Sequence, residues 1–321
     1  MLKLITTIPV RNGEAFIAQT LESVARQTLK PDRVIVIDNC SKDRTEEIVK
    51  NFKGISCEFI RNPKDLGLFQ NFNRCLEFAD QTEFLQILHA DDTIEPVFYE
   101  TMTGLLADCK GFGMAWCIDE RVDEENRHLS MSGKVDGVTE LLTRDQFLQR
   151  KAEIGNQAIC ATLLRTGGKP VPCQFPLDFP IVGDMVYWAA FGAHCDAIVH
   201  LHKAIAKYRW HGGTQTASYD SIQILVFDEW RAMEKNEMLR GVGWQFFRKL
   251  KLKGLMSVRA NIKARRVRQN GNAAYAKEIA EAGRGLTGWP LWLAGKSLVL
   301  ARDFYLFKIM GRTRHPRNIY G

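Results

Sequence analysis

The feature that most constrains the fold is an apolar run at residues 84–88 that is followed closely by the carboxylate pair Asp91-Asp92. A short apolar run predicts a buried strand, because strands of parallel sheets are apolar on both faces. In an open α/β sheet the ligand crevice lies beyond the carboxyl ends of the strands, where these carboxylates would fall. Two hard oxygen donors suit Mg²⁺ or Mn²⁺ carrying a diphosphate. The alternative is a turn, with Asp92-Thr93 capping a helix that starts near Pro96.

The preceding residues alternate between strand and helix patterns. Helices are expected where apolar residues recur at three- and four-residue spacing, and Ser41 is expected to cap the second of them. The predicted strands lie at 2–9, 33–37 and 57–60, and the predicted helices at 14–27, 41–52 and 68–79. Strands that alternate with helices indicate an α/β fold, Rossmann-like, with a mostly parallel central sheet flanked by helices. Residues 1–110 are therefore expected to form a nucleotide-binding half.

The second half of the same domain is expected at residues 111–218. A buried element at 154–164 fits either a strand or a helix, because periodicity alone does not separate the two. An irregular loop is expected at 170–180. Helices are predicted at 98–108, 143–151 and 183–191, a strand at 113–122, and two short strands at 198–203 and 204–208.

Charge is distributed unevenly along the chain. Residues 240–321 contain 18 lysines and arginines but three acidic residues, whereas residues 1–239 contain 26 and 34. A basic helical region at 219–321 is therefore expected to meet a polyanion, either an anionic membrane surface or nucleic acid. Its longest uncharged run, at 285–295, has eleven residues, and a membrane span needs about 20. An interfacial helix pair and a helical cap on the domain remain as alternatives.

The cysteines and the N-terminus point to the cytoplasm. None of the eight cysteines forms a C-x-x-C pair, so the sequence signals neither a cysteine-based zinc module nor a disulfide framework. The first apolar run is too short for a signal peptide. We therefore expect a cytoplasmic protein, with peripheral attachment to the inner face of the cell membrane as the membrane alternative.

Four motifs follow one another in the chain: Pro9-Val10-Arg11-Asn12, then Val36-Ile37-Asp38-Asn39-Cys40-Ser41-Lys42-Asp43, then His89-Ala90-Asp91-Asp92, and finally Gly183-Asp184 with Tyr208-Arg209-Trp210-His211. In order and spacing they resemble the family 2 glycosyltransferases of the GT-A fold, over about residues 1–218. The resemblance implies an inverting, metal-dependent hexosyltransferase-type enzyme. Its donor would be a nucleotide-diphosphate sugar, with UDP favoured, and its acceptor a hydroxyl of a glycan or lipid-linked molecule in cell-surface polysaccharide synthesis.

The resemblance also implies roles for individual residues on the donor side. It assigns the metal, Mn²⁺ or Mg²⁺, to Asp91, Asp92 and His211, and a hydrogen bond with the nucleobase to Asp38. Asn39-Cys40 stands where Asp-Gly is commoner in the family, and His89 stands where many members carry the first acid of D-x-D. It assigns nucleotide-sugar binding to Pro9, Arg11, Asn12, Asp38, Asn39, Gly67, His89, Ala90 and Asp91.

On the acceptor side the resemblance assigns the catalytic base to Asp184, preceded here by Gly183 rather than by a second acid. Trp188 follows four residues later, so it is expected on the same helical face, near the acceptor. Gly212-Gly213, with the hydroxyls of Thr214 and Thr216, would close over the diphosphate. Structural alternatives stay open: an aspartate that opens a helix can simply complement the helix dipole, and residues 209–216 can form a surface turn.

Two other classes compete with this interpretation. A sugar nucleotidyltransferase normally carries a glycine-rich basic loop after its first strand, and residues 8–13 do not supply one. A nucleic-acid-binding protein that uses the basic region would be favoured by aromatic residues among the charges, and residues 265–269 have none nearby. We therefore expect no nucleic-acid partner.

Overall fold

The computed structural model describes residues 2–154, 157–179, 181–211 and 273–288, together with scattered positions between 254 and 296. Within this part of the chain ten strands form one sheet, in the order β3-β2-β1-β4-β9-β6-β10-β5, with β7 paired to β6 and β8 to β10. The strands are β1 Leu2–Val10, β2 Arg33–Asp38, β3 Glu58–Arg61, β4 Thr82–Ile87, β5 Thr93–Ile94, β6 Phe112–Val122, β7 His128–Met131, β8 Thr139–Leu141, β9 Thr162–Arg165 and β10 Cys195–Arg209.

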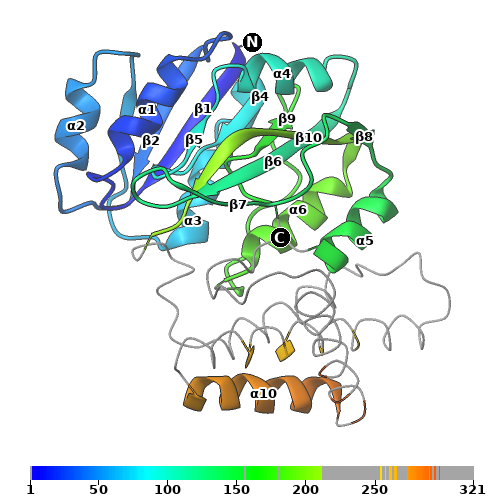
Figure 1. The fold of residues 1–321 in the computed structure, drawn as a ribbon. Coiled ribbons are helices and arrows are strands. Elements are labelled where there is room, and N and C mark those ends of the chain that lie inside the picture. The colour runs from blue at the N-terminus through cyan, green and yellow to red at the C-terminus, as the bar shows by residue number, and fades with distance from the viewer. Residues whose placement is uncertain are drawn as a thin grey trace.

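Helices cover both faces of this sheet (Figure 1). The alternation of side chains along β2 shows why: Val34 and Val36 join one buried cluster with residues of α1 and α4, while Ile35 and Ile37 join another with residues of α3, α5 and α6. The strands are apolar on both faces because both faces are covered. The helices are α1 Ile17–Ala25, α2 Thr45–Asn51, α3 Leu68–Leu76, α4 Phe98–Leu105, α5 Arg144–Ile154, α6 Gly183–Gly192 and α10 Ala273–Thr287.

The sheet is parallel where the sequence predicts a nucleotide-binding half. β1 pairs in parallel with β2 and with β4, and β2 pairs in parallel with β3. β9 lies antiparallel between β4 and β6, and β6 pairs in parallel with β10. The carboxyl ends of β1, β2 and β4 therefore meet at one edge of the sheet, as the α/β interpretation predicts.

Two predicted helix starts are wrong for local reasons. α1 begins at Ile17, because the N–H groups of Phe16 and Ile17 both donate to the carbonyl of Gly13 in a preceding turn. α2 begins at Thr45, and Ser41 does not cap it. Instead the N–H of Thr45 donates to Asp43 Oδ1 over 3.1 Å. Aspartate side chains accept such local backbone N–H groups as readily as serine side chains do.

One prediction about strands is wrong, and the structure decides two alternatives that the sequence left open. The segments 198–203 and 204–208 belong to one strand, β10, whose register against β6 shifts on both sides of Ala204. A bulge therefore interrupts the alternation that suggested two strands. The buried element at 154–164 contributes its last residues to a strand, β9. Thr93 belongs to β5, so Asp92-Thr93 does not cap α4, which begins at Phe98.

The basic region predicted at 219–321 is described only in part. Ala260 and Ile279 are buried and belong to the same hydrophobic cluster as the α3 and α6 side of the sheet, which supports a helical cap. The rest of this prediction lies outside the described residues. Among the helices that the structure describes, none combines the length and the apolarity that crossing a membrane requires.

Candidate active site

The segment after β4 is held in place from two sides. Thr20 of α1 donates its hydroxyl to the carbonyls of Ala90 and Asp92, over 2.9 Å in each case. The N–H of Arg209, the last residue of β10, donates to Asp92 Oδ1 over 2.8 Å. Asp92 is only 1% exposed. These bonds fix the position of the acid pair, which lies in a turn after β4 where the N–H of Asp92 also donates to the carbonyl of His89.

The guanidinium of Arg209 forms a second anchor. It is buried, and Phe16 lies against it with the ring centroid 4.7 Å from Cζ. Nε donates to the carbonyl of Asp91 over 2.8 Å, Nη1 to the carbonyls of residues 123–124, and Nη2 to Gln19 Oε1 over 3.1 Å. Arg209 therefore joins β10, the segment after β4, the turn after β6 and α1 at one point. The sequence interpretation quoted Arg209 only as part of a motif and assigned it no role.

Two histidines flank the acid pair. His211 Nε2 lies 3.0 Å from Asp91 Oδ2, and the His211 ring lies against Phe16. His89 Nδ1 lies 3.4 Å from Asp92 Oδ2, and its ring stacks on Phe72 with centroids 5.1 Å apart. The structure thus brings together the three predicted metal ligands and His89. The hinge Gly212-Gly213 and the hydroxyls of residues 214 and 216 lie outside the described residues.

Burial and neighbouring charges shift the pKa values of the two carboxylates in opposite directions. Burial alone raises the pKa of Asp91, but the hydrogen bond with His211 and the charge of His89 outweigh it, so this pKa lies below its ordinary value. Burial, reinforced by the charge of Asp91, raises the pKa of Asp92 above its ordinary value. Burial lowers the pKa of His89, but its contact with Asp92 and the surrounding carboxylates reverse this, so its pKa is raised overall. The acid pair carries a strong local negative field that a cation would relieve.

The residues at this edge fit a divalent cation. His89, Asp91 and Asp92 each offer a ligand atom, all within 4.8 Å of one another. His89 Nε2 is buried and has no hydrogen-bond partner among the described residues, and the buried Asp92 Oδ2 has only the 3.4 Å contact with His89 Nδ1. Leaving such atoms unpaired costs free energy, so they mark a place where a polar ligand or an ion belongs. Two carboxylates with imidazole nearby are a donor set that Mn²⁺ accepts readily and Mg²⁺ accepts through its oxygens.

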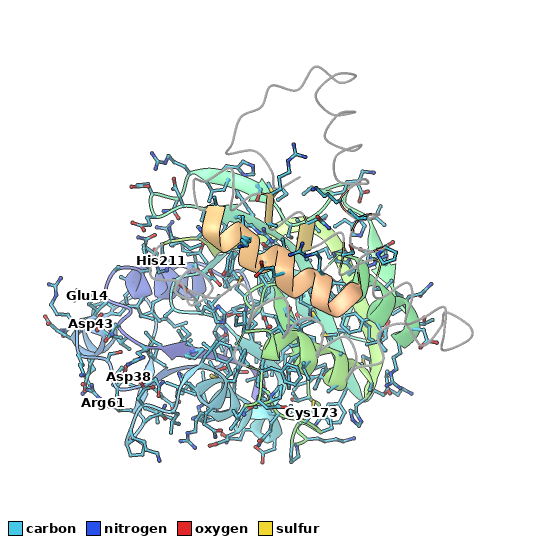
Figure 2. All side chains as sticks on the ribbon, turned by 90° about the horizontal axis from the view of Figure 1, so that it is seen from below. Glu14, Asp38, Asp43, Arg61, Cys173 and His211 are labelled. Carbon is cyan, nitrogen blue, oxygen red and sulfur yellow. The ribbon has the colours of Figure 1, made fainter. Side chains whose placement is uncertain are left out.

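The predicted nucleobase pocket lies at the ends of β1 and β2. Asp38 is fully buried; its oxygens accept the N–H of Ser41 over 3.1 and 3.2 Å and lie 3.3 Å from Arg61 Nε. Asn12 binds the same loop through its N–H, which donates to Ser41 Oγ, and its Oδ1, which accepts from Lys42. Pro9 is buried next to Ile37 in the parallel register. Figure 2 shows Asp38 and Arg61 side by side at this end of the molecule.

The left-handed backbone at Cys40 shows why glycine is commoner at this position in the family and what the departure costs. Cys40 has φ of 62°, where glycine is the residue of least strain. Its neighbour Asn39 holds the following loop, since Nδ2 donates to Asp65 Oδ1 over 2.7 Å and Oδ1 accepts the N–H of Leu66 over 2.9 Å. Cysteine therefore keeps the turn at the cost of about 1 kcal/mol.

Arg11 and Gly67 both meet that loop. Arg11 is exposed and pairs with Asp65 over 2.9 Å. Gly67 has φ of 76° and ψ of 178° immediately before α3, a conformation that requires glycine. Both residues therefore lie beside the predicted base pocket, and their roles in nucleotide binding stay predictions.

Asp184 approaches the acid pair from α6. It is the second residue of that helix, and its Oδ1 accepts the N–H of Met185 over 2.8 Å. Its charge raises the pKa of His89 after the contributions of the acid pair, which shows that Asp184 and His89 share one electrostatic environment. Trp188 is 1% exposed and packs on Phe175, and its indole N–H has no hydrogen-bond partner in the described structure. The acceptor-side role of Trp188 stays a prediction.

A buried lysine lies close to Asp184, and the sequence interpretation missed it. Lys151 of α5 is 3% exposed, with Nζ 4.9 Å from the ring centroid of Trp116 and 5.2 Å from that of Phe147. Burial lowers the pKa of Lys151 to about 7, although the charge of Asp184 acts in the opposite direction. Nothing in the local pattern of α5 marks this lysine, because the predicted helix gave no reason to place it inside.

We expect Lys151→Met to stabilise the protein near neutral pH. Below pH 7 the lysine is charged in both states, so the folded protein carries the full cost of a buried charge. As the pH rises from 7 towards 10.5, the unfolded chain binds the proton more than the folded protein does, and stability therefore rises. The substitution should raise the free energy of unfolding at pH 7 by about 2–5 kcal/mol and flatten its rise with pH.

Urea unfolding at several pH values measures this effect. Lys64→Met is the matched control, because Lys64 is exposed, and it should keep both the stability and the pH dependence of the wild type. A Lys151→Met protein that retains the wild-type slope between pH 7 and 10 would show that Lys151 does not titrate there.

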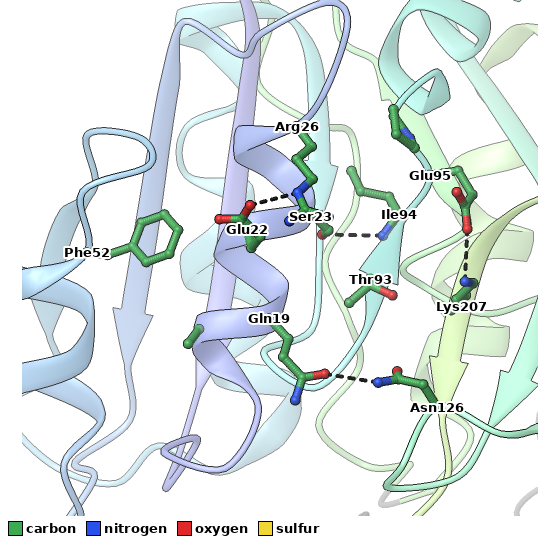
Figure 3. A pocket seen from close by; sticks show the side chains of 12 residues that line it. Gln19, Glu22, Ser23, Arg26, Phe52, Thr93, Ile94, Glu95, Asn126 and Lys207 are labelled. Carbon is green, nitrogen blue, oxygen red and sulfur yellow. Dashed lines mark hydrogen bonds and ion pairs between the residues drawn. The ribbon is translucent and has the colours of Figure 1, made fainter.

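A cavity of about 610 Å³ opens elsewhere, between α1, β5 and the turn after β6 (Figure 3). Its charged side chains pair with each other: Arg26 with Glu22 over 2.7 Å, and Lys207 with Glu95 over 3.0 Å. Asn126 likewise donates to Gln19 Oε1. These polar side chains of the lining therefore already have partners within the cavity, and the acid pair remains the better candidate for a ligand site.

Comparison with known proteins adds independent evidence. The family model described as Glycosyl transferase family 2 matches residues 6–166. An uncharacterized glycosyltransferase of Methanocaldococcus jannaschii is 33% identical over 86 residues, which is 26% of this chain and 29% of that protein. The putative glycosyltransferase EpsH of Bacillus subtilis is 28% identical over 102 residues, covering 32% of this chain and 29% of EpsH. The alignments thus span 29% of the length of each of these relatives.

Solved structures match over a longer stretch. The structure of S. aureus TarS 1-349 in complex with UDP-GlcNAc has a TM-score of 0.58 at 16% identity and covers 89% of this chain and 90% of that one. The corresponding complex with UDP has a TM-score of 0.57 at the same identity and the same coverage. At this identity the likeness establishes the fold, and it agrees with the sheet and helices described above.

Proposed function

The chain belongs to glycosyl transferase family 2, and on this premise we propose that it is an inverting, metal-dependent glycosyltransferase. Its donor is a nucleotide-diphosphate sugar and its acceptor a hydroxyl of a glycan or lipid-linked molecule. The observation that carries the proposal is the sheet edge where Asp91, Asp92, His89 and His211 gather and which shares its electrostatic environment with Asp184. The family relationship and this geometry support the same reaction class.

On the donor side, UDP is the nucleotide we propose. The TarS complexes contain UDP and UDP-GlcNAc, and the fold is shared, which supports a uridine nucleotide here. Asp38 at the end of β2 would accept a hydrogen bond from the base, with Asn12 and Arg11 beside it. Because both Asp38 oxygens accept from Ser41 and Oδ2 also contacts Arg61, base binding would require Arg61 to share or yield its position.

At the diphosphate, Asp91, Asp92 and His211 would hold Mn²⁺ or Mg²⁺. When bound, the ion supplies Lewis-acid neutralisation of the leaving diphosphate. His89 would hold its Nε2–H towards a phosphate oxygen, since Nδ1 faces Asp92 and Nε2 is the unpaired nitrogen. Arg209 would hold the acid pair in place, because its N–H donates to Asp92 Oδ1 and its Nε donates to the carbonyl of Asp91.

At the acceptor, Asp184 would take the proton from the attacking hydroxyl. The hydroxyl oxygen then forms a bond to the anomeric carbon while the bond from that carbon to the diphosphate oxygen breaks. A single in-line displacement of this kind inverts the anomeric configuration. Positioned proton transfer of this type contributes about 10²–10⁴-fold to a rate.

The basic residues of 240–321 fit enzymes whose acceptor is held at a membrane. We propose that this region holds the protein peripherally at an anionic, cytoplasmic membrane surface in polysaccharide synthesis, each lysine or arginine near the surface contributing about 1 kcal/mol. The helical cap that Ala260 and Ile279 support is compatible with this role, since a cap can present its outer face to lipid.

A panel of nucleotide sugars tests the proposed reaction. The full chain, first treated with EDTA, is assayed for slow release of nucleoside diphosphate with and without added Mn²⁺. We expect release from a UDP-sugar only when Mn²⁺ is present. Release of pyrophosphate from a nucleoside triphosphate when a sugar 1-phosphate is added would instead indicate a sugar nucleotidyltransferase. Salt-sensitive RNA binding without any hydrolysis would indicate a nucleic-acid-binding protein.

A further inference from the structure

A second cluster of metal-binding side chains lies where β8 pairs with β10. Glu140 of β8 is directly opposite His200 of β10 in the antiparallel register, and His202 follows two residues later. Residues two apart on a strand share a face, and so do directly paired residues on neighbouring strands. The backbone alone therefore places all three side chains on one face. The cluster is seven residues before Arg209, or about 20 Å of strand, and so is distinct from the acid pair.

The three ligand atoms have the spacing of a metal site. His202 Nε2 lies 2.9 Å from Glu140 Oε2 and 3.2 Å from His200 Nδ1, and His200 Nδ1 lies 3.6 Å from Glu140 Oε2. In tetrahedral zinc sites, with ligands about 2.0–2.1 Å from the ion, neighbouring ligand atoms are about 3.3 Å apart. The three measured distances lie on either side of that value.

We propose that Glu140, His200 and His202 form a zinc site with three protein ligands and one open position. Two imidazoles and one carboxylate are a donor set for zinc, whereas Mg²⁺ and Ca²⁺ prefer oxygens alone. The site needs no cysteine, which is why the cysteine pattern of the sequence does not reveal it. This inference stands on its own and does not rest on the proposed glycosyl transfer.

Neighbouring groups hold both histidines in a ligating orientation. His202 Nδ1 lies 3.0 Å from Asp136 Oδ1, so when an ion binds Nε2 the proton on Nδ1 can be donated to this carboxylate. A carboxylate behind a histidine is the usual support of a zinc ligand. The His200 ring stacks on Trp116 with centroids 4.5 Å apart.

Arg150 of α5 acts as a competitor for this position. Its Nη1 contacts Glu140 and lies 2.9 Å from His200 Nδ1. In the absence of an ion the guanidinium supplies the positive charge that the carboxylate needs. When zinc binds, this charge must move away, because two cations cannot share the same ligands. Removing it should therefore strengthen zinc binding, which a simple Arg–Glu–His network would not do.

Zinc titration of the EDTA-treated full chain tests the proposal. All variants carry Asp91→Asn, which weakens metal binding at the acid pair, and Co²⁺ serves as a second probe because its visible absorption distinguishes tetrahedral from octahedral coordination. We expect one equivalent of Zn²⁺ per chain and a tetrahedral Co²⁺ spectrum. His202→Ala should weaken zinc binding by about 100-fold or more and Asp136→Asn by about 10-fold, whereas Arg150→Gln should strengthen it.

The matched control is His128→Ala, which removes an exposed histidine that also pairs with a glutamate, Glu120, over 2.9 Å. It should leave zinc affinity unchanged. No zinc uptake, or uptake that is indifferent to His202→Ala and Asp136→Asn, would overturn the proposal. Should His202→Ala fail to fold, the opposite shifts expected for Asp136→Asn and Arg150→Gln decide the question. An Arg150→Gln protein that binds zinc no more tightly would show that the cluster is a salt-bridge network only.

Discussion

Replacing Asp184 by asparagine is expected to lower kcat for sugar transfer about 10²–10⁴-fold and to leave the Kd for UDP unchanged. The carboxylate would be the proton acceptor for the incoming hydroxyl, and the amide cannot accept that proton. The nucleotide contacts proposed at Asp38 and at the acid pair lie on other elements, β2 and the segment after β4, so donor binding should survive. Steady-state release of UDP in the presence of acceptor gives kcat, and calorimetric titration with UDP gives Kd.

A matched control separates catalysis from helix stability. Asp184 lies in the first turn of α6, where an acidic side chain also complements the helix dipole. Asp145 occupies the first turn of α5 and is exposed. Asp145→Asn should therefore lose a comparable dipole interaction and keep full activity. Equal losses in both variants would mean that Asp184 acts through the helix rather than on the acceptor.

Replacing Asp91 by asparagine is expected to lower kcat/KM at a fixed Mn²⁺ concentration about 10²–10³-fold, the range seen when one charge-stabilising group is removed from a site. Asp91 is a sharper test than Asp92, because the Arg209 N–H bonds to Asp92 and the segment should keep its position. Loss of one ligand weakens ion binding, so raising Mn²⁺ should restore part of the activity. A Mn²⁺ titration of the reaction rate measures this shift.

Asp108→Asn serves as the control for Asp91→Asn, since Asp108 is exposed in the segment after α4. It should show the wild-type Mn²⁺ dependence. If Asp91→Asn and Asp184→Asn both retained full activity, the proposed division of labour between leaving group and proton acceptor would be wrong.

The sequence predicts long elements well and short ones poorly. Runs of apolar residues predict β1, β2, β4 and β6; β3 is the exception among the short strands, because it has only four residues and was also predicted. β5, β7 and β8 contain two to four residues, too few to establish a period. The two-strand interpretation of β10 failed at Ala204, where a bulge changes the register and breaks the alternation on which that interpretation relied.

The residues of the candidate site likewise fall into those that the sequence could place and those that it could not. Side chains that follow strand ends, such as Asp91 and Asp92, could be placed because parallel strands deliver their ends to one edge. The contacts of Arg209 could not be predicted, because its partners are mostly main-chain carbonyls. Every residue has a carbonyl, so the residue types do not show which carbonyls it binds. The zinc cluster shows an intermediate case: His200 and His202 have a visible spacing, but Glu140 is 60 residues away and only strand pairing identifies it.

The position of Arg209 also determines when the site can be completed during synthesis. Its guanidinium bonds to Gln19, 190 residues earlier in the chain, and its N–H completes the surroundings of Asp92. Synthesis proceeds from the N-terminus and domains generally fold as units, so the acid pair emerges well before the strand residue that anchors it, 117 positions later. The proposed ion site would therefore be completed only after residue 209 has been synthesised, when nearly the whole of the sheet is available.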